Sequence, residues 1–160
     1  MSDINYVDTE TEEELIAEGR KWLLIAGIVL AAVNVAVFLS AFVPHSVTDI
    51  IAAAGSSIGI VCGVILAAGT RHCRKVMAAD LVLSALPVAA VLIIRFIGMF
   101  SGYSAELTGF MQILKAVWEF LKTFAVHILA IAAYGFAQVL AFVNIYETKA
   151  VRSYICSKNA

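Results

Sequence analysis

The sequence predicts an all-α integral membrane protein, a four-helix bundle that forms a single domain over residues 1–160. Apolar residues make up 62% of the chain and charged residues 14%, with a mean hydropathy of +0.93. Soluble domains are usually about half apolar and about a quarter charged. The apolar residues also gather in four continuous stretches, each long enough to cross a hydrocarbon core of roughly 30 Å as a helix. Lipid is therefore the expected solvent.

The four predicted spans cover residues 22–43, 50–69, 76–97 and 118–143. The first two contain no charged residue. Asp80 and Arg95 interrupt the third, and the outer half of the fourth carries Glu119, Lys122 and His127. In all four, the apolar runs are continuous rather than alternating, which is typical of spanning helices and not of the strands of a membrane barrel.

Lys and Arg predict the orientation of the bundle, because they concentrate in cytoplasmic loops. With the N-terminus inside, eight of them are cytoplasmic and three are outside. The inner set is Arg20, Lys21, Arg71, Arg74, Lys75, Lys149, Arg152 and Lys158, and the outer set is Arg95, Lys115 and Lys122. We therefore expect both termini, including the tail 144–160, in the cytoplasm. A cell or inner membrane is the expected location.

The segment before the first span, residues 1–21, is acidic. Its seven acids are Asp3, Asp8, Glu10, Glu12, Glu13, Glu14 and Glu18. Thr11 and Glu14 fit a capping box, so we expect the first helix to begin near Thr11. The acids either form a solvated extension of that helix or a docking surface for a basic partner or a divalent cation. Their spacing does not fit an EF-hand loop, which also needs a glycine at its turn.

A stripe of small residues runs along the second span at four-residue spacing: Gly55, Gly59, Gly63 and Ala67. Looser matches occur in the first span, at Gly27 and Ala31 and again at Ala32, Ala36 and Ser40. Such positions lie on one helix face and let another backbone approach closely. The stripe therefore predicts tight helix packing, either with a neighbouring span or with another copy of the chain.

Polar residues within the spans mark packing or function, because they are costly in hydrocarbon without a partner. The candidates are Asn34, Asp80, Glu119, Thr123, His127, Tyr134 and Gln138. Helical rise places Asn34 level with His127, Asp80 level with Gln138, and Arg95 with Glu119 at the outer interface. The five on the fourth span fall within an arc of roughly 100°. This face either lines a hydrated ion or proton path that uses His127, or forms hydrogen bonds between helices.

Other features concern helix breaks and interfaces. Pro87 predicts a kink or a break in backbone hydrogen bonding, with Ser84 one turn earlier as a donor to a freed carbonyl. Residues 104–117 form either an interfacial helix or an outward extension of the fourth span. Trp22 and Trp118 are placed as interface anchors. Cys73 and Cys156 are each expected to be either an ordinary free thiol or an acylation site.

The absence of known chemical motifs limits the function. No phosphate loop or hydrolase motif occurs, so we expect no enzyme, cofactor or metal site. A net charge of −1 argues against nucleic-acid binding. The leading hypothesis is a membrane-embedded assembly or interaction subunit whose partners are the lipid bilayer, other membrane proteins or further copies. The alternative is a small oligomeric ion or proton channel or transporter that uses the polar face of the fourth span.

Overall fold

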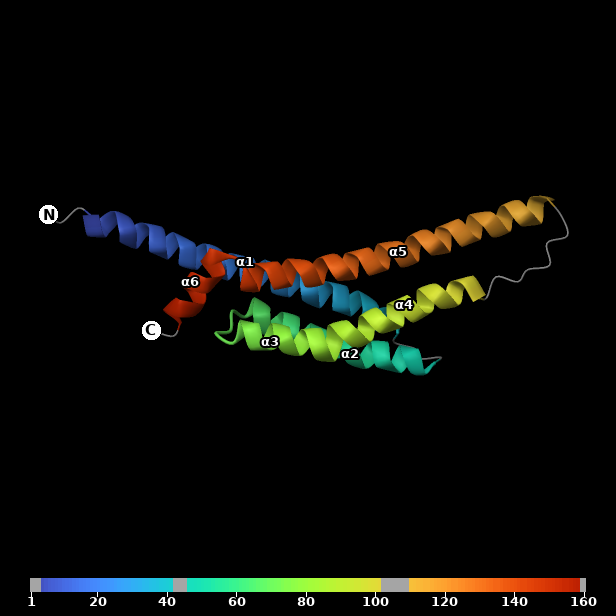
Figure 1. Ribbon diagram of the computed structural model, residues 1–160, viewed down its shortest axis with the longest axis horizontal. Helices are drawn as coiled ribbons and strands as arrows, with labels where there is room; N and C mark the ends of the chain where they lie inside the picture. The colour runs from blue at the N-terminus through green and yellow to red at the C-terminus, as the bar shows by residue number, and fades with distance from the viewer. Residues whose placement is uncertain (1–3, 42–45, 102–109, 159–160) are drawn as a thin grey trace.

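The computed structural model describes residues 4–41, 46–101 and 110–158, and every regular element in these ranges is a helix (Figure 1). The elements are α1 (Ile4–Ser40), α2 (Val47–Ala67), α3 (Cys73–Asp80), the π-helical turn η1 (Leu81–Ala85), α4 (Leu86–Ser101), α5 (Phe110–Tyr146) and α6 (Lys149–Ser157). Because α3, η1 and α4 follow one another without a gap, they form one continuous rod.

Four segments are long and apolar enough to cross a membrane, which confirms the predicted four-span bundle. They are Thr11–Ser40, Val47–Ala67, Cys73–Gly98 and Ile113–Tyr146. The start of α1 and the end of α6 lie at the same end of the bundle (Figure 1). We call this the terminal end, and its cytoplasmic location stays a prediction.

Helix α1 corrects the expected start of the first helix. It begins at Ile4, so Thr11 lies inside the helix and the interpretation of Thr11 as the first N-cap is wrong. The physical reason is that residues 4–18 contain neither Gly nor Pro, so nothing in this acidic segment stops the helix from extending towards the N-terminus.

Helix α2 has well-defined caps at both ends. It starts at Val47, three residues before the predicted span, because Ser46 and Asp49 form a capping box. It ends at Ala67, and Gly69 then adopts a left-handed conformation with φ of 74°, which an L side chain rarely adopts. The Ser-x-x-Asp pattern was present in the sequence and could have located this start.

Helix α5 decides between two predicted forms of the connector before the fourth span. It is a single helix of 37 residues from Phe110 onward, so the part of residues 104–117 that is described extends the fourth span outward. Residues 104–109 lie outside the described ranges. A helix of this length measures about 55 Å, well above the roughly 30 Å of a hydrocarbon core.

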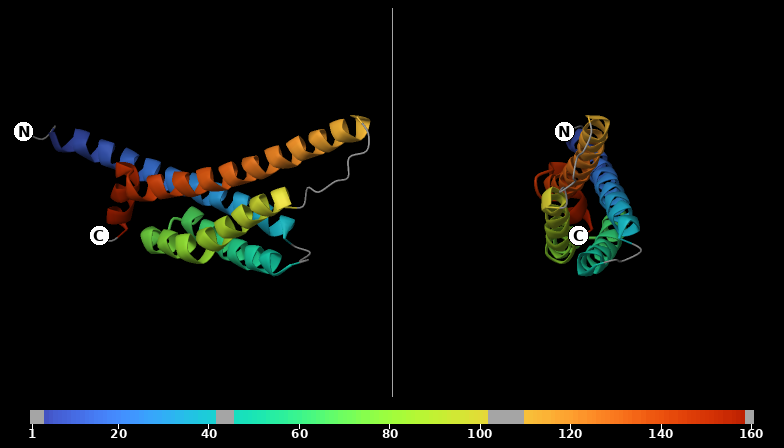
Figure 2. Two further views of the ribbon diagram at one scale, coloured as in Figure 1. Left: turned by 45° about the vertical axis from the view of Figure 1, so that its right-hand side comes forward. Right: turned by 90° about the vertical axis from the view of Figure 1, so that its right-hand side faces the viewer.

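The terminal end is the best-packed part of the bundle, because α1, α2, α3, α5 and α6 all contribute to its core (Figure 2). Its fully buried side chains include Leu23, Leu30, Leu66, Met77, Ile145 and Val151. Helix α6, which was not predicted within the tail, lies against α1. A Cβ on Gly19 would be 2.1 Å from the Ala150 carbonyl oxygen, so these two backbones approach as closely as glycine allows.

Candidate functional site

Several polar side chains are buried where a membrane interior would surround the bundle. They are Asn34, Ser56, Asp80, Ser84, Tyr134, Gln138 and Asn144. Four elements supply them: α1, α2, the α3–η1 rod and the inner half of α5. Among them, Asp80 carries the only formal charge. We therefore take the surroundings of Asp80 as the candidate site.

The first half of the site joins α1 to η1 through one hydrogen bond between side chains. The Ser84 hydroxyl donates to Asn34 Oδ1 at 3.3 Å, and Asn34 Nδ2 donates to the Leu30 carbonyl at 2.9 Å. Gly59 of α2 makes room for this pair, since a Cβ there would be 2.4 Å from Asn34 Cγ and 2.5 Å from Ser84 Oγ. Glycine at position 59 is therefore required by a polar contact inside the chain.

The other residues of the small-residue stripe also pack against other helices of the same chain. A Cβ on Gly63 would lie 2.7 Å from the Ala31 amide nitrogen and 2.8 Å from the Gly27 carbonyl oxygen. Gly27 in turn faces the Ala67 backbone at 2.4 Å, while Gly55 faces Val88 of α4 at 3.1 Å. The stripe thus holds α2 against α1 on one side and against the η1–α4 rod on the other.

Asp80 is the residue of the site whose burial is least compensated by hydrogen bonds. Its side chain is fully buried, and both carboxylate oxygens have no hydrogen-bond partner within the described residues. The side chains of Ser84 and Gln138 lie beside this carboxyl group without reaching hydrogen-bond geometry. The predicted common level of Asp80 and Gln138 agrees with this arrangement. A charged carboxylate in this position would cost several kcal/mol if nothing neutralised it.

The inner half of α5 supplies the wall opposite Asp80. Gln138 Nε2 donates to the Tyr134 hydroxyl at 3.4 Å, while Gln138 Oε1 is buried without a hydrogen-bond partner within the described residues. Tyr134 also lies near Asp80 and Ser84. The site therefore presents one carboxyl group together with neutral hydroxyl and amide oxygens, which are hard ligands for a proton or a small cation.

The π-helical turn η1 positions Ser84 within this site. Leu86 donates its N–H to the Leu81 carbonyl, five residues back, and Pro87 follows with no N–H to give. The predicted break at Pro87 therefore takes the form of this wider turn. The expected role of Ser84 was wrong, because its hydroxyl bonds Asn34 on another helix rather than a freed carbonyl of its own helix.

The predicted polar face of the fourth span divides into two parts. Tyr134 and Gln138 are buried in the site, whereas Glu119 and Thr123 are exposed and His127 is only partly buried. His127 Nδ1 lies 2.8 Å from the Thr123 carbonyl of its own helix, and Asn34 bonds Ser84 instead of His127. The tertiary structure therefore leaves the outer three residues of the face away from Asp80.

The end of the bundle opposite the termini holds an ion pair that sequence reasoning missed. Arg95 of α4 pairs with Asp49 at the start of α2, rather than with Glu119 at the same level. The same Asp49 closes the α2 capping box with Ser46. This contact ties α4 to α2, and it shows that Arg95 has a structural partner.

A groove connects the site with the outside of the bundle. It has a volume of about 400 Å³ and lies between the η1–α4 rod and α5. Its lining is apolar apart from Tyr134 and Gln138, and includes Leu81, Val82, Ala85, Leu86, Ala89, Gly135 and Val139. Two side chains of the site are therefore accessible from the membrane-facing side.

Cys73 and Cys156, the two predicted candidates for acylation, differ in the exposure of their thiols. Cys73 is fully buried at the start of α3, which excludes acylation of its thiol in this fold, whereas Cys156 on α6 is exposed.

Comparison with protein-family models, with curated proteins and with solved structures finds no match to this chain.

Proposed function

We propose that this protein binds a proton or a small monovalent cation at Asp80 and moves it across the membrane as a small, non-enzymatic channel or transporter. The observation that supports this proposal is the full burial of a carboxyl group whose oxygens lack hydrogen-bond partners within the described residues. Ionisable residues inside membranes commonly mark ion and proton pathways.

The charge of the site favours a ligand of charge +1. Asp80 is its single carboxyl group among the residues that the structure describes, and Ser84, Tyr134 and Gln138 add only neutral oxygens. A bound proton or Na⁺ cancels the carboxylate charge, which removes most of the cost of burial. Ca²⁺ fits less well, because it takes six to eight oxygen ligands that usually include several carboxylates.

The proposal differs from the one that the sequence suggested, because it centres on Asp80 rather than on His127. The groove between the η1–α4 rod and α5 is lined by Tyr134 and Gln138, and both side chains lie near Asp80, which makes them the route that we propose from the groove to Asp80. A rotation of the Gln138 side chain would open this route, since the bond that holds its amide group among the described residues is the long, 3.4 Å contact with Tyr134.

The test is ion flux in proteoliposomes that carry a pH-sensitive dye and a Na⁺-sensitive dye inside, measured with Na⁺ and with choline as the main cation. We expect flux from the wild-type protein and at least a tenfold loss in Asp80→Asn. The matched control is Asp49→Asn, which makes the same chemical change at the Arg95 ion pair and should keep its flux. Flux that persists in choline identifies the proton, and flux that requires Na⁺ identifies the cation.

Two results would reject transport at Asp80. The first is flux no greater than that of empty liposomes. The second is equal flux in the wild type and in Asp80→Asn. Since Asn matches Asp in size and is uncharged, the variant should fold, and its elution profile in detergent checks this.

We also propose, as a second function, that the outer half of α5 associates with a second copy of the chain. Measured from Tyr146, about 20 residues reach only to His127, so the rest of the helix rises above the hydrocarbon. This part carries large exposed apolar side chains: Ile113, Leu114, Val117, Trp118 and Leu121. A contiguous apolar surface outside the lipid core marks an interaction site.

Crosslinking and native mass spectrometry in mild detergent test this second proposal. Leu114→Ala with Trp118→Ala should convert oligomers into monomers. The control, Ile93→Ala with Ile97→Ala, removes two exposed apolar residues from α4 and should leave the oligomer intact. A wild-type protein that is monomeric throughout contradicts the proposal. Gly59→Leu is unsuitable here, because Gly59 packs against Asn34 and Ser84 within the chain.

A further inference from the structure

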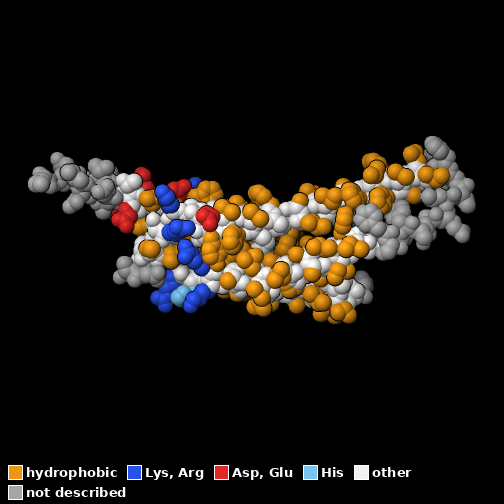
Figure 3. Space-filling model, in the orientation of Figure 1, with side chains coloured by type: hydrophobic (Ala, Val, Ile, Leu, Met, Phe, Trp, Pro, Cys, Tyr) orange, Lys and Arg blue, Asp and Glu red, His pale blue; other side chains and the backbone are white. Residues whose placement is uncertain are grey.

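A basic pocket lies at the terminal end of the bundle, between the α2–α3 turn, the first turn of α3 and α6. It has a volume of about 300 Å³ and is lined by Arg71, His72, Arg74, Lys75, Arg152, Ile155 and Cys156. Figure 3 shows the Lys, Arg and His side chains gathered at this end. Within the described residues, no carboxylate lines the pocket and none of its cationic side chains forms an ion pair.

The pocket is organised by Tyr146, the last residue of α5. The Tyr146 hydroxyl donates to the Arg74 carbonyl at 3.2 Å, and the Arg74 guanidinium lies 5.6 Å from the Tyr146 ring centroid. The Tyr146 carbonyl accepts two bonds from Arg152, at 3.3 Å from Nε and 2.8 Å from Nη2. Tyr146 thus positions Arg74 of α3 and Arg152 of α6 in the wall of the same pocket.

The position of α6 is set by the turn after α2. The Tyr154 hydroxyl donates to the Gly69 carbonyl at 2.9 Å, and Lys158 Nζ donates to the same oxygen at 3.1 Å. Gly69 has a positive φ, a backbone conformation that glycine adopts without strain and other residues rarely adopt. The direction of its carbonyl group therefore depends on glycine at this position. The walls of the pocket therefore belong to the fold.

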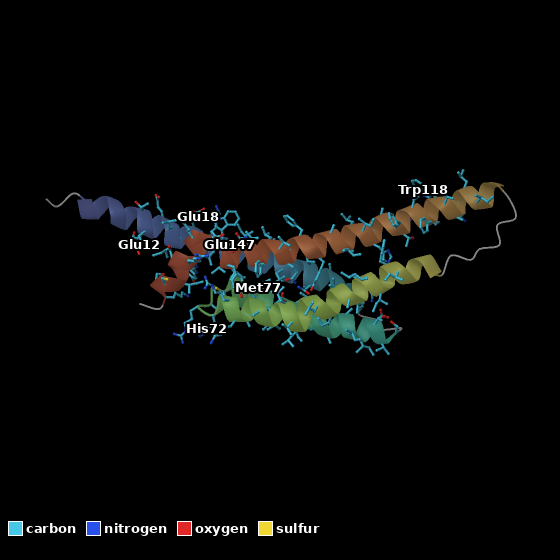
Figure 4. All side chains as sticks on the ribbon, in the orientation of Figure 1. Glu12, Glu18, His72, Met77, Trp118 and Glu147 are labelled. Atoms are coloured by element: carbon cyan, nitrogen blue, oxygen red, sulfur yellow. The ribbon has the colours of Figure 1, made fainter. Side chains whose placement is uncertain are left out.

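The ends of three spans place this pocket at the membrane surface. Helix α2 ends at Ala67, α3 begins at Cys73 and α5 ends at Tyr146. In Figure 4, His72 and Glu147 both lie at this end of the bundle, far from Trp118 on α5. The first turn of α3 adds to the positive potential, because His72 provides no side-chain cap for its N–H groups. This is the level at which lipid phosphates lie.

We propose that this pocket binds the phosphate-bearing headgroup of an anionic phospholipid. Guanidinium groups bind phosphate through paired, charge-assisted hydrogen bonds, and Arg71, Arg74 and Arg152 surround one cavity. Ile155 supplies an apolar wall for the part of a lipid next to its headgroup. Basic pockets between spanning helices at this level are known to bind anionic lipid headgroups.

The test titrates the detergent-solubilised full chain with phosphatidylglycerol, with phosphatidylcholine and with inorganic phosphate, and measures binding by native mass spectrometry and the shift in Tm. The informative variant is Arg71→Gln with Lys75→Gln, because in the described part of the chain neither side chain bonds another helix. We expect wild-type protein to bind phosphatidylglycerol preferentially and the variant to bind it about 30-fold more weakly.

The matched control is Arg20→Gln with Lys21→Gln, which removes two exposed charges at the terminal end but outside the pocket. It should bind phosphatidylglycerol as the wild type does. Equal weakening in both double variants overturns the proposal, because it shows diffuse attraction to the surface. Inorganic phosphate that stabilises the protein as well as the lipid also overturns it, in favour of a soluble anion. A second variant, Arg152→Gln, should weaken lipid binding in the same direction.

Discussion

The two halves of α5 are both rich in apolar residues, yet they behave differently in the fold. In the inner half, buried positions recur every three or four residues: Tyr134, Ala137, Gln138, Ala141, Asn144 and Ile145. In the outer half, no side chain between Ile113 and Ala133 is buried, although the same helix continues without a break. Figure 2 shows the inner half against its neighbours and the outer half extending away from them.

This difference shows that hydropathy indicates whether lipid solvates a helix, but does not indicate which other helix packs against it. The inner half packs in the core of the terminal end through Ala141 and Ile145. In the outer half, Phe124 packs on Phe96 of α4, with ring centroids 5.7 Å apart, yet no fully buried face forms. Because lipid is as apolar as Leu, association between spans depends on close fit, which small residues make feasible.

The largest expected effect comes from filling the closest helix contact. Gly63→Leu should destabilise the fold by about 3 kcal/mol or more, because its side chain would overlap the Ala31 and Gly27 backbone. Gly135→Leu on α5 is the control, since nothing lies within 4 Å of a Cβ there. Unfolding in mixed detergent micelles measures both. Equal effects would contradict the assignment of the glycine stripe to contacts within the chain.

A smaller effect is expected from removing a large side chain in each half of α5. Ile145→Ala should cost about 2 kcal/mol, the lower end of the range for such truncations, because Ile145 is fully buried in the terminal-end core. Ile128→Ala in the outer half should change stability by less than about 0.5 kcal/mol, since Ile128 is exposed. The same unfolding assay compares them. A large loss for Ile128→Ala in monomeric protein would break the contrast between the halves.

The smallest effect concerns hydrogen bonding. Ser84→Ala should cost about 1 kcal/mol, because it removes the bond to Asn34 and leaves a buried amide oxygen unpaired. Thr123→Ala, on the exposed part of the predicted polar face, should cost less than about 0.5 kcal/mol. Thermal unfolding at fixed detergent concentration is sufficient to rank them. The reverse order would show that the outer polar face contributes more to folding than the Asp80 site.

Several features of the fold were accessible from the sequence. The four spans, the shared level of Asp80 and Gln138 and the irregular backbone near Pro87 follow from continuous apolar runs, from helical rise and from the missing N–H of proline. Other features were misread. The partner of Arg95 is Asp49, which a depth argument cannot identify, because several residues share each level and only the order of helices around the bundle selects among them.

By itself, the sequence determines that the chain crosses the membrane four times, because the length and hydropathy of a segment decide whether lipid or water solvates it. It also determines which side chains need partners there. Only the tertiary structure decides which partners they find. It brings Asp80 beside Gln138, uses the glycine stripe within the chain, and folds α6 back to complete the basic pocket. Each depends on contacts between residues far apart in the chain, which no local pattern encodes.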